Sequence, residues 1–182
     1  MNSVLSKLPM RLHHNAFTTA DHEKNRQFYE DILGFPLIAM YIEQTTFDGE
    51  AVEVGHALYG LGDGSALAFF QIHGAVPDES WMATPQPIYV HIALLVDEAT
   101  QAELADRLKL AGKDCVVRDH GYCHSLYVRD PNGLLLEFTV DHPDAATMTE
   151  EMTQSAHADM QRWVQGNRAP NNRWRPQPTA AR

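Results

Sequence analysis

A chain of 182 residues is long enough for one domain with a substantial core, or for two small modules that share one. Its hydrophobic content of 44% and charged content of 21% are typical of a globular protein. The formal net charge of −10 argues against a nucleic-acid partner, because neutralising phosphates requires a basic surface.

The sequence has no recognisable membrane or secretory segment. Its first residues, MNSVLSKLPM, lack the apolar stretch of a signal peptide, and no run of about 18 apolar residues follows. Cys115 and Cys123 lack the spacing of a redox motif and are too few for a disulfide framework. We therefore expect a soluble, cytoplasmic protein with free thiols and no membrane partner.

The first predicted module spans residues 11–73. Its opening strand contains His14, and Asp21 follows where it can cap a helix. That helix ends at Gly34, a residue suited to the position after a helix C-terminus. Three strands follow, the last two joined by the turn GLGDGS, and we expect them near residues 35–43, 53–60 and 65–72.

A proline-rich linker, residues 74–87, leads to a second module, residues 88–141, with the same order of elements. Here His91 opens the first strand, Asp97 is placed to cap the helix, and Gly112 is placed to end it. Three further strands are expected, the last two joined by the turn RDPNG, near residues 114–119, 122–129 and 134–141.

The C-terminal region, residues 142–182, predicts a helix near 147–165 followed by a tail. TMTE, which starts at Thr147, fits a capping box, and Gly166 fits a helix end. Apolar residues recur at helical spacing along this helix: Met148, Met152, Ala156, Met160 and Trp163. We expect this stripe to pack on the outside of a sheet or on a second subunit, as in a homodimer. Five arginines and no acid follow Gln161, so the tail either crosses an acidic surface of a partner chain or stays disordered.

The two modules repeat one βαβββ unit. A four-stranded sheet with a single helix leaves one face bare, so two such units together can close around a shared interior. The predicted fold class is α+β. We expect paired βαβββ modules that form a cup-shaped mixed sheet around a metal site, plus a C-terminal helix.

Three side chains are candidate metal ligands. His14 and His91 occupy equivalent places in the repeat, and aligning GDGSALAFF with DPNGLLLEF puts Glu137 over Phe69. A carboxylate among apolar neighbours is costly unless it is paired or binds a metal, and two histidines with one carboxylate form a typical ligand set. His13 is expected to point away from His14, because adjacent strand side chains alternate. The alternatives are that Glu137 lies on an exposed sheet face and that His91 is an ordinary core histidine.

In these residues the chain resembles the vicinal oxygen chelate superfamily, which includes glyoxalase I, extradiol dioxygenases, and fosfomycin- and bleomycin-resistance proteins. The matching segments lie within about residues 11–141 and read LHHNAFTTAD, FYEDILGF, YVHIALLVD and HSLYVRDPNGLLLEF. The resemblance implies paired modules and a divalent metal held by inward-facing strand residues. Glyoxalase I enzymes carry a second glutamate where Phe69 stands, which disfavours glyoxalase chemistry. Bleomycin-resistance proteins lack metal ligands, whereas this chain retains three.

The remaining pattern is similar to that of extradiol dioxygenases and fosfomycin-resistance enzymes. Tyr127 stands ten residues before the metal-ligand candidate Glu137, where extradiol enzymes carry a tyrosine, and it is the candidate catalytic residue. The catalytic histidine of those enzymes would fall here at about Ser65, so His56 or His73 would have to replace it. Two further histidines, His120 and His124, are expected at surface or supporting positions.

The resemblance therefore implies a divalent-metal-dependent enzyme, most like an extradiol ring-cleaving dioxygenase that acts on a small catechol-type substrate. Fe(II) is the favoured cofactor, because two imidazoles and a carboxylate leave open positions for a diolate and O₂, and Mn(II) is the alternative. Two other functions stay open. One is a glyoxalase- or fosfomycin-resistance-like lyase or transferase, and the other is a non-enzymatic module that binds an aromatic ligand.

Overall fold

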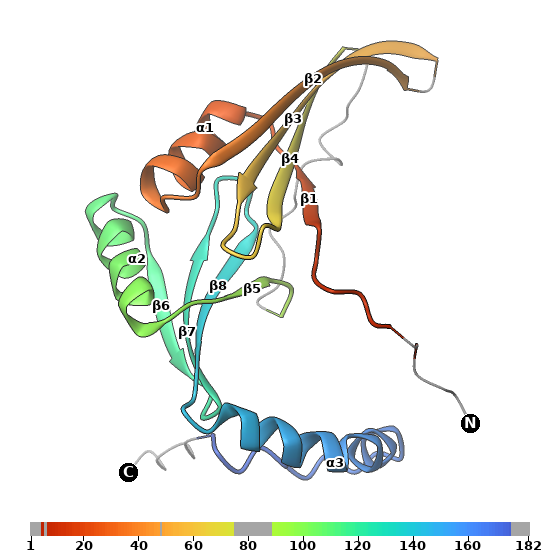
Figure 1. The fold of residues 1–182 in the computed structure, drawn as a ribbon, viewed down its shortest axis with the longest axis vertical. Coiled ribbons are helices and arrows are strands. Elements are labelled where there is room, and N and C mark those ends of the chain that lie inside the picture. Colours follow the sequence, from red (N-terminus) through yellow and green to blue (C-terminus); the bar gives the residue numbers. More distant parts are fainter. Residues whose placement is uncertain (1–4, 6, 48, 75–88, 176–182) are drawn as a thin grey trace. The chain divides into compact units, whose positions relative to one another are not determined.

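The fold is that of a computed structural model, which describes residue 5 and residues 7–47, 49–74 and 89–175 (Figure 1). The expected linker therefore lies outside the described residues except at Gly74. Contacts divide the chain into two units, Met1–Val90 with Arg129–Leu134, and His91–Val128 with Leu135–Arg182. The short turn Arg129–Leu134 is thus grouped with the first unit, although the strands on either side of it lie largely in the second.

The first unit has the expected βαβββ order. Its elements are β1 (His14–Thr18), α1 (His22–Arg26), η1 (Gln27–Ile32), β2 (Leu37–Phe47), β3 (Glu50–Gly60) and β4 (Ala66–Gly74). The sheet order is β1-β4-β3-β2, with β1 parallel to β4 and the other pairs antiparallel. The helix changes character at η1, which is π-helical, and Leu33 N–H donates to the Phe28 carbonyl at 3.0 Å. This wider turn allows Phe28, Tyr29 and Leu33 all to be buried.

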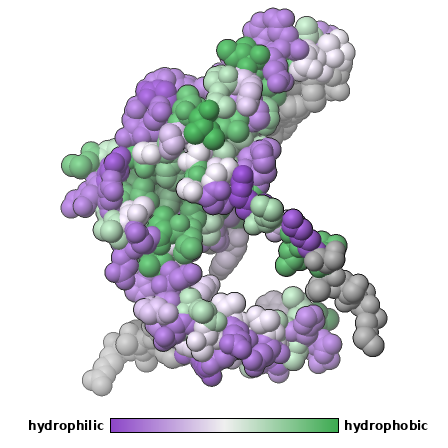
Figure 2. All heavy atoms as spheres, in the orientation of Figure 1, coloured by the Kyte–Doolittle hydropathy of each residue, from purple (hydrophilic) through white to green (hydrophobic). Residues whose placement is uncertain are grey.

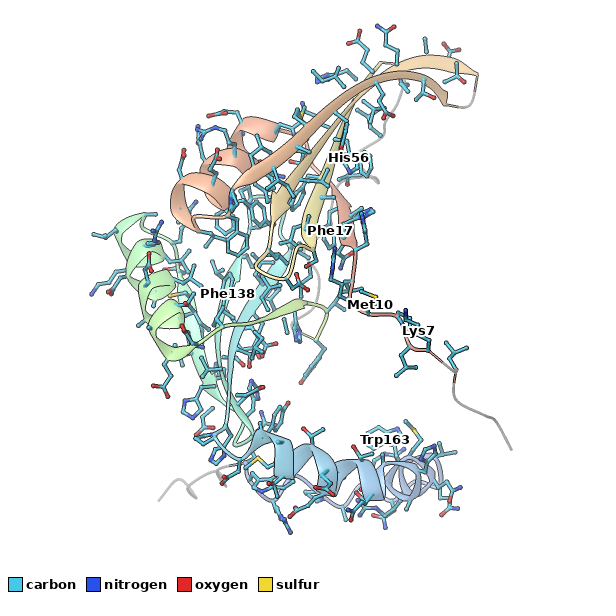
Figure 3. All side chains as sticks on the ribbon, viewed as in Figure 1. Lys7, Met10, Phe17, His56, Phe138 and Trp163 are labelled. Atoms are coloured by element: carbon cyan, nitrogen blue, oxygen red, sulfur yellow. The ribbon has the colours of Figure 1, made fainter. Side chains whose placement is uncertain are left out.

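Aromatic side chains fill the core between this helix and its sheet. The ring of Tyr29 lies 5.1 Å from that of Tyr59 and 4.9 Å from that of Phe69. On β1, Phe17 lies 5.8 Å from Phe69 (Figure 3). The Tyr29 hydroxyl donates a hydrogen bond to Asp130 Oδ2 at 2.9 Å. This bond ties the turn Arg129–Leu134 to the helix.

The same turn satisfies further buried polar groups of the first unit. Asn132 Oδ1 accepts from Thr19 Oγ1 at 2.8 Å, and Asn132 Nδ2 donates to Asn25 Oδ1 at 2.9 Å. Thr19, Asn25 and Asp130 are all buried. Burial raises the pKa of Asp130 above its ordinary value, against the opposing effect of hydrogen bonds from Asn132, Leu134 and Tyr29. The buried side chains of Asp130 and Leu134, and the hydrogen bonds of Asn132, thus anchor the turn to the first unit.

The second unit repeats the βαβββ order and adds a C-terminal helix. Its elements are β5 (Ile92–Leu95), α2 (Glu98–Leu110), β6 (Cys115–Asp119), β7 (Cys123–Arg129), β8 (Leu135–Asp141) and α3 (Ala145–Val164). The sheet order is β5-β8-β7-β6, with β5 parallel to β8 and β6 antiparallel to β7. Leucines of α2 and apolar residues of the sheet form its core: Leu104, Leu108, Leu126, Leu136 and Phe138.

In both units, the aspartate predicted to cap the first helix and the glycine predicted to follow it are confirmed. Asp21 accepts hydrogen bonds from two backbone N–H groups at 3.0 and 3.1 Å, and Asp97 accepts one from Thr100 N–H at 2.7 Å. Gly34 and Gly112 follow the helices with φ of +80° and +65°, a region that residues with a Cβ rarely adopt.

The C-terminal helix α3 begins earlier than predicted. Asp144 is its N-cap and makes no side-chain capping hydrogen bond, so the predicted capping box at Thr147 is wrong. Thr147 instead lies within the first turn of the helix. The predicted end is confirmed, since α3 ends at Val164 and Gly166 has a φ of +89°.

The described part of the arginine-rich tail meets α3 of its own chain. Arg173 forms an ion pair with Glu151, and the guanidinium of Arg168 lies 4.0 Å from the centroid of the Trp163 ring. Through these contacts the tail runs back along helix α3. Residues 176–182 lie outside the described part of the chain.

The apolar stripe of α3 is only partly covered. Met148 is buried, whereas Met160 and Trp163 are 64% and 59% exposed. Figure 2 shows a mostly hydrophilic face of α3 with hydrophobic side chains along one border, and Trp163 projects from the helix in Figure 3. Within the described residues, no helix is both long enough and apolar enough to cross a lipid bilayer.

Candidate functional site

The two hairpin turns determine how the modules align. Gly64 and Gly133 each donate their N–H to the carbonyl three residues earlier, at 3.0 and 3.1 Å, and have φ of 79° and 84°. Four residues beyond these glycines stand Ala68 and Glu137. The predicted match of Glu137 with Phe69 is therefore wrong by one residue, because the glycine with positive φ sets the register of the hairpin. Ala68 carries no carboxylate either, so the first module still lacks a counterpart of Glu137.

Strand pairing supports the equivalence of the two histidines. Glu137 pairs with Ala93 across β8 and β5, and its counterpart Ala68 pairs with Ala16 across β4 and β1. Two residues before each of these alanines stands one of the two predicted ligand histidines. Because side chains on a strand repeat their direction every two residues, His14 shares a sheet face with the position of Ala68. His91 immediately precedes β5, and its contact with Glu137 places it on the same side as that carboxylate.

In the second unit His91 and Glu137 form a close pair. His91 Nε2 lies 2.7 Å from Glu137 Oε2. Glu137 is only 6% exposed in β8, so it does not lie on a solvent-facing side of the sheet. A buried carboxylate is tolerated only with a positive charge or hydrogen-bond donors close to it, and His91 provides a donor.

Tyr127, the predicted catalytic residue, lies beside this pair. Its ring meets that of His91 edge to face, with centroids 6.0 Å apart. Burial, together with the Glu137 carboxylate, raises the pKa of Tyr127 to about 12. The hydroxyl therefore keeps its proton at neutral pH and acts as a hydrogen-bond donor.

His120 contacts the same tyrosine, a role that the sequence did not reveal. His120 Nε2 lies 2.9 Å from the Tyr127 hydroxyl oxygen. His120 precedes β7 in a tight turn around Gly121, and Tyr127 lies well inside the strand. Their contact depends on how the turn folds back, which no pattern of residue types indicates. By contrast, His124 pairs with Asp119 at 3.5 Å and is largely exposed, as expected.

In the first unit His14 is held by its neighbour. His13 Nδ1 and His14 Nδ1 lie 2.8 Å apart, so one of them donates to the other. The expectation that His13 points away is wrong, because β1 begins only at His14 and strand alternation does not extend to His13. The contact occupies Nδ1 of His14 and leaves Nε2 as the nitrogen that a metal ion would take.

Ser65 stands about where the resemblance places the acid–base histidine of extradiol enzymes, and it lies in the first unit. Ser65 is buried and donates to Asp63, which makes it part of the turn. His56, labelled in Figure 3, has its ring 6.3 Å from that of His14 and stacked at 3.8 Å on that of Phe70. Its buried Nε2 has no hydrogen-bond partner among the described residues, and burial lowers the pKa of His56.

The donors found here suit a divalent cation. An imidazole and a carboxylate already face each other at 2.7 Å in the second unit, and His14 presents a second imidazole in the first. Within the described residues, no three His, Cys, Asp or Glu side chains come together in one complete metal site. The structure thus joins two of the three predicted ligands, His91 and Glu137, and places the third in the other unit.

A family model places the chain among known proteins. Residues 11–138 match the model of the Glyoxalase/Bleomycin resistance protein/Dioxygenase superfamily. The chain belongs to this superfamily. The match confirms the vicinal oxygen chelate resemblance and covers both βαβββ repeats. None of the curated protein sequences matches the chain significantly.

Solved structures of the superfamily share this fold. A glyoxylase/bleomycin resistance protein/dioxygenase domain from Frankia sp. is 19% identical and aligns over 75% of this chain and 95% of its own, with a TM-score of 0.53. The fosfomycin resistance protein FosX from Listeria monocytogenes is 19% identical over 80% and 98%, with a TM-score of 0.52. A FosX variant complexed with Mn(II) and a dihydroxypropylphosphonic acid is 18% identical over 77% and 99%, with a TM-score of 0.54. At these identities the likeness concerns the fold alone.

Proposed function

We propose that this protein is a divalent-metal-dependent enzyme, most like an extradiol ring-cleaving dioxygenase acting on a catechol-type substrate. His91 and Glu137 would hold the metal together with His14. Fe(II) is the favoured ion and Mn(II) the alternative. His91 and Glu137 are supported by their contact, and His14 by its equivalence to His91 in the repeat.

The observation that carries the proposal is the buried Glu137 carboxylate with His91 Nε2 at 2.7 Å. A structural ion pair alone would explain the contact less well, because the carboxylate stands at the sheet position that the superfamily's repeat assigns to a ligand. A cation binds only to deprotonated imidazole nitrogens and carboxylates, so metal affinity should rise with pH.

The remaining residues define what the site can do. A bound divalent ion would lower the pKa of a catechol hydroxyl, so that the substrate binds as an anion. Tyr127 keeps its proton at neutral pH and can donate a hydrogen bond to a negatively charged substrate oxygen. His56 has a buried ring nitrogen without a partner among the described residues, and its ring lies 6.3 Å from that of His14, so we assign it the role of accepting a substrate proton.

Anaerobic reconstitution tests the proposal. Protein loaded with Fe(II) should bind one metal ion per chain and consume oxygen with members of a catechol panel. His91→Ala and Glu137→Gln should lose both metal and oxygen uptake. His124→Ala serves as the matched control, because His124 lies in the same unit but pairs only with exposed Asp119. Wild-type protein that binds Fe(II) and consumes no oxygen with any catechol would refute the dioxygenase assignment.

A second function is favoured by one observation. Ser65 occupies the place of the dioxygenase histidine and is engaged with Asp63, so it cannot transfer protons there. A Mn(II)-dependent transferase or lyase similar to the fosfomycin-resistance group does not require that histidine. Loss of fosfomycin from a mixture with Mn(II)-loaded protein and a thiol or water, followed by ³¹P NMR, would favour this function. Aromatic ligand binding without turnover of either substrate would favour the binding module instead.

A further inference from the structure

The C-terminal tail, residues 167–175, lies on the turn that carries His120, and we call this segment the strap. Asn172 Nδ2 donates a hydrogen bond to the His120 carbonyl at 3.2 Å. The strap backbone passes so close to Gly121 that a Cβ there would lie 2.1 Å from the Trp174 carbonyl oxygen. Only glycine fits at this position, and its φ of +82° agrees with that requirement. The strap is therefore seated directly against the turn.

The end of the strap reaches the His120 ring. Arg175 N–H donates to Asn172 Oδ1 at 3.1 Å, which fixes the start of the arginine side chain. Arg175 Nη2 then lies 3.3 Å from His120 Nδ1. A guanidinium group carries hydrogen-bond donors and no acceptor, so His120 Nδ1 must be the acceptor of this bond. The proton of a neutral His120 ring is consequently on Nε2.

The opposite side of the same ring faces Tyr127. His120 Nε2 lies 2.9 Å from the Tyr127 hydroxyl oxygen, and with a proton on Nε2 the histidine donates to that oxygen. The Tyr127 proton then points away from His120, so the hydroxyl can donate it to another acceptor. The hydrogen bonds run in one direction, from Arg175 through His120 to Tyr127. All three residues belong to the second unit.

We propose that Arg175 is a positioning residue that fixes the Nε2–H tautomer of His120 and thereby the direction of the Tyr127 hydroxyl. His120 acts in the same way, through Tyr127, and neither residue needs to touch the substrate. The importance of these hydrogen bonds for catalysis rests on the proposed function, because only that proposal gives Tyr127 a catalytic role. The tautomer of His120 is a property of the protein that does not depend on any reaction.

NMR of protein labelled with ¹⁵N-histidine tests the tautomer directly. Long-range ¹H–¹⁵N spectra distinguish Nδ1–H from Nε2–H imidazoles, and loss of a signal in His120→Gln assigns His120. The full-length wild type should show His120 as the Nε2–H form. Arg175→Ala should shift this signal toward a mixture of tautomers, and Arg175→Lys, which keeps a cationic donor, should restore it. Arg168→Ala is the control, because Arg168 belongs to the strap but lies on Trp163.

A second measurement follows turnover in the metal-loaded enzyme. Arg175→Ala should lower kcat by about tenfold with an unchanged metal content and KM, and it should add nothing further in a Tyr127→Phe background. An Nδ1–H tautomer in the wild type, or a signal unaffected by Arg175→Ala, would overturn the proposal. If the wild type shows no turnover but the tautomer behaves as described, the proposed function fails and the positioning role of Arg175 stands.

Discussion

Glu137 and Tyr127 show how much of a site a single sequence can reveal. The cost of a carboxylate in the strand LLLEFTV pointed to Glu137, and the repeat pointed to His91, and the structure brings the two together at 2.7 Å. The alignment between modules was displaced by one residue, because residue types in a turn do not show which glycine adopts positive φ. His120 was assigned no specific role because its contact with Tyr127 arises from the path of the turn.

The Tyr127 hydroxyl provides the first prediction at this scale. Tyr127→Phe removes a hydrogen-bond donor without changing the packing of the ring, so turnover should fall on the order of 10²-fold. Metal content should stay at the wild-type level, because phenylalanine alters neither His91 nor Glu137. Steady-state kinetics and metal analysis on the same preparation check both outcomes. A variant that loses its metal would assign Tyr127 a structural role instead.

His56 and His73 can be separated by a matched pair of variants. His56 stacks on Phe70 near His14, whereas His73 is exposed and contacts Gln71 at 3.1 Å. If His56 accepts the substrate proton, His56→Gln should lower kcat by roughly 10²-fold and His73→Gln should have little effect. Equal activities of the two variants, measured by oxygen uptake, would remove His56 from the mechanism.

Buried hydrogen bonds give a stability prediction for the first unit. Tyr29→Phe leaves Asp130 buried with one donor fewer, so the free energy of unfolding should fall by about 1–3 kcal/mol. Tyr41→Phe is the control, because the Tyr41 side chain is largely exposed. Urea unfolding followed by circular dichroism measures both. Equal midpoints for the two variants would show that the Tyr29–Asp130 bond contributes no net stability.

At the scale of elements, capping residues and helix-ending glycines were predictable and the internal shape of the helices was not. Asp21 and Asp97 cap the helices that the repeat assigned to them. The π-helical turn η1 was missed, because burial of the adjacent residues Phe28 and Tyr29 depends on the surrounding core. Helix α3 starts before the capping-box motif, since its first turn forms even without a side-chain cap. Local motifs thus predict where a helix can begin, and packing decides whether it does.

The cap of α2 has a pH-dependent effect. Hydrogen bonds from the Thr100 hydroxyl and backbone N–H lower the pKa of Asp97 below its ordinary value of 3.8. A carboxyl group with a lowered folded-state pKa stabilises the protein above its unfolded-state pKa, and this stabilisation disappears as the pH falls through the folded-state value. Asp97→Ala should therefore lower the urea midpoint at about pH 7, and the difference from the wild type should shrink as the pH falls through the folded-state pKa of Asp97. Asp97→Asn, which retains a capping oxygen, should stay closer to the wild type at neutral pH, and a difference that persists in acid would contradict the assignment.

At the scale of the whole molecule, the internal repeat predicted two βαβββ units, and the resemblance of several motifs predicted membership of the superfamily; both are confirmed. The sequence did not predict that a turn of the second repeat would belong to the first unit. The turn RDPNG sits inside the second repeat, yet Asp130 and Asn132 contact Tyr29, Thr19 and Asn25 of the first unit. Sequence periodicity detects repeats along the chain and carries no information on which repeat a turn packs against.

This arrangement predicts how fragments should behave. A fragment of residues 1–90 lacks the turn that satisfies its buried polar groups, so it should give a poorly dispersed NMR spectrum on its own. Adding the complementary fragment, residues 91–182, should restore the dispersed signals. The same second fragment with Asn132→Ala and Asp130→Ala should restore them less well. A well-dispersed, cooperatively unfolding fragment 1–90 would show that the turn is dispensable for the first unit.

The same turn also sets an order of events on the ribosome. Protein synthesis proceeds from the N-terminus at about 5–20 residues per second, and N-terminal domains ordinarily fold before later ones emerge. Here the hydrogen bonds of Tyr29, Thr19 and Asn25 with Asp130 and Asn132 can form only after the turn Arg129–Leu134 has left the exit tunnel. The N-terminal unit of this protein is therefore made first and completed late, and a nascent chain paused before residue 129 would hold it unfinished.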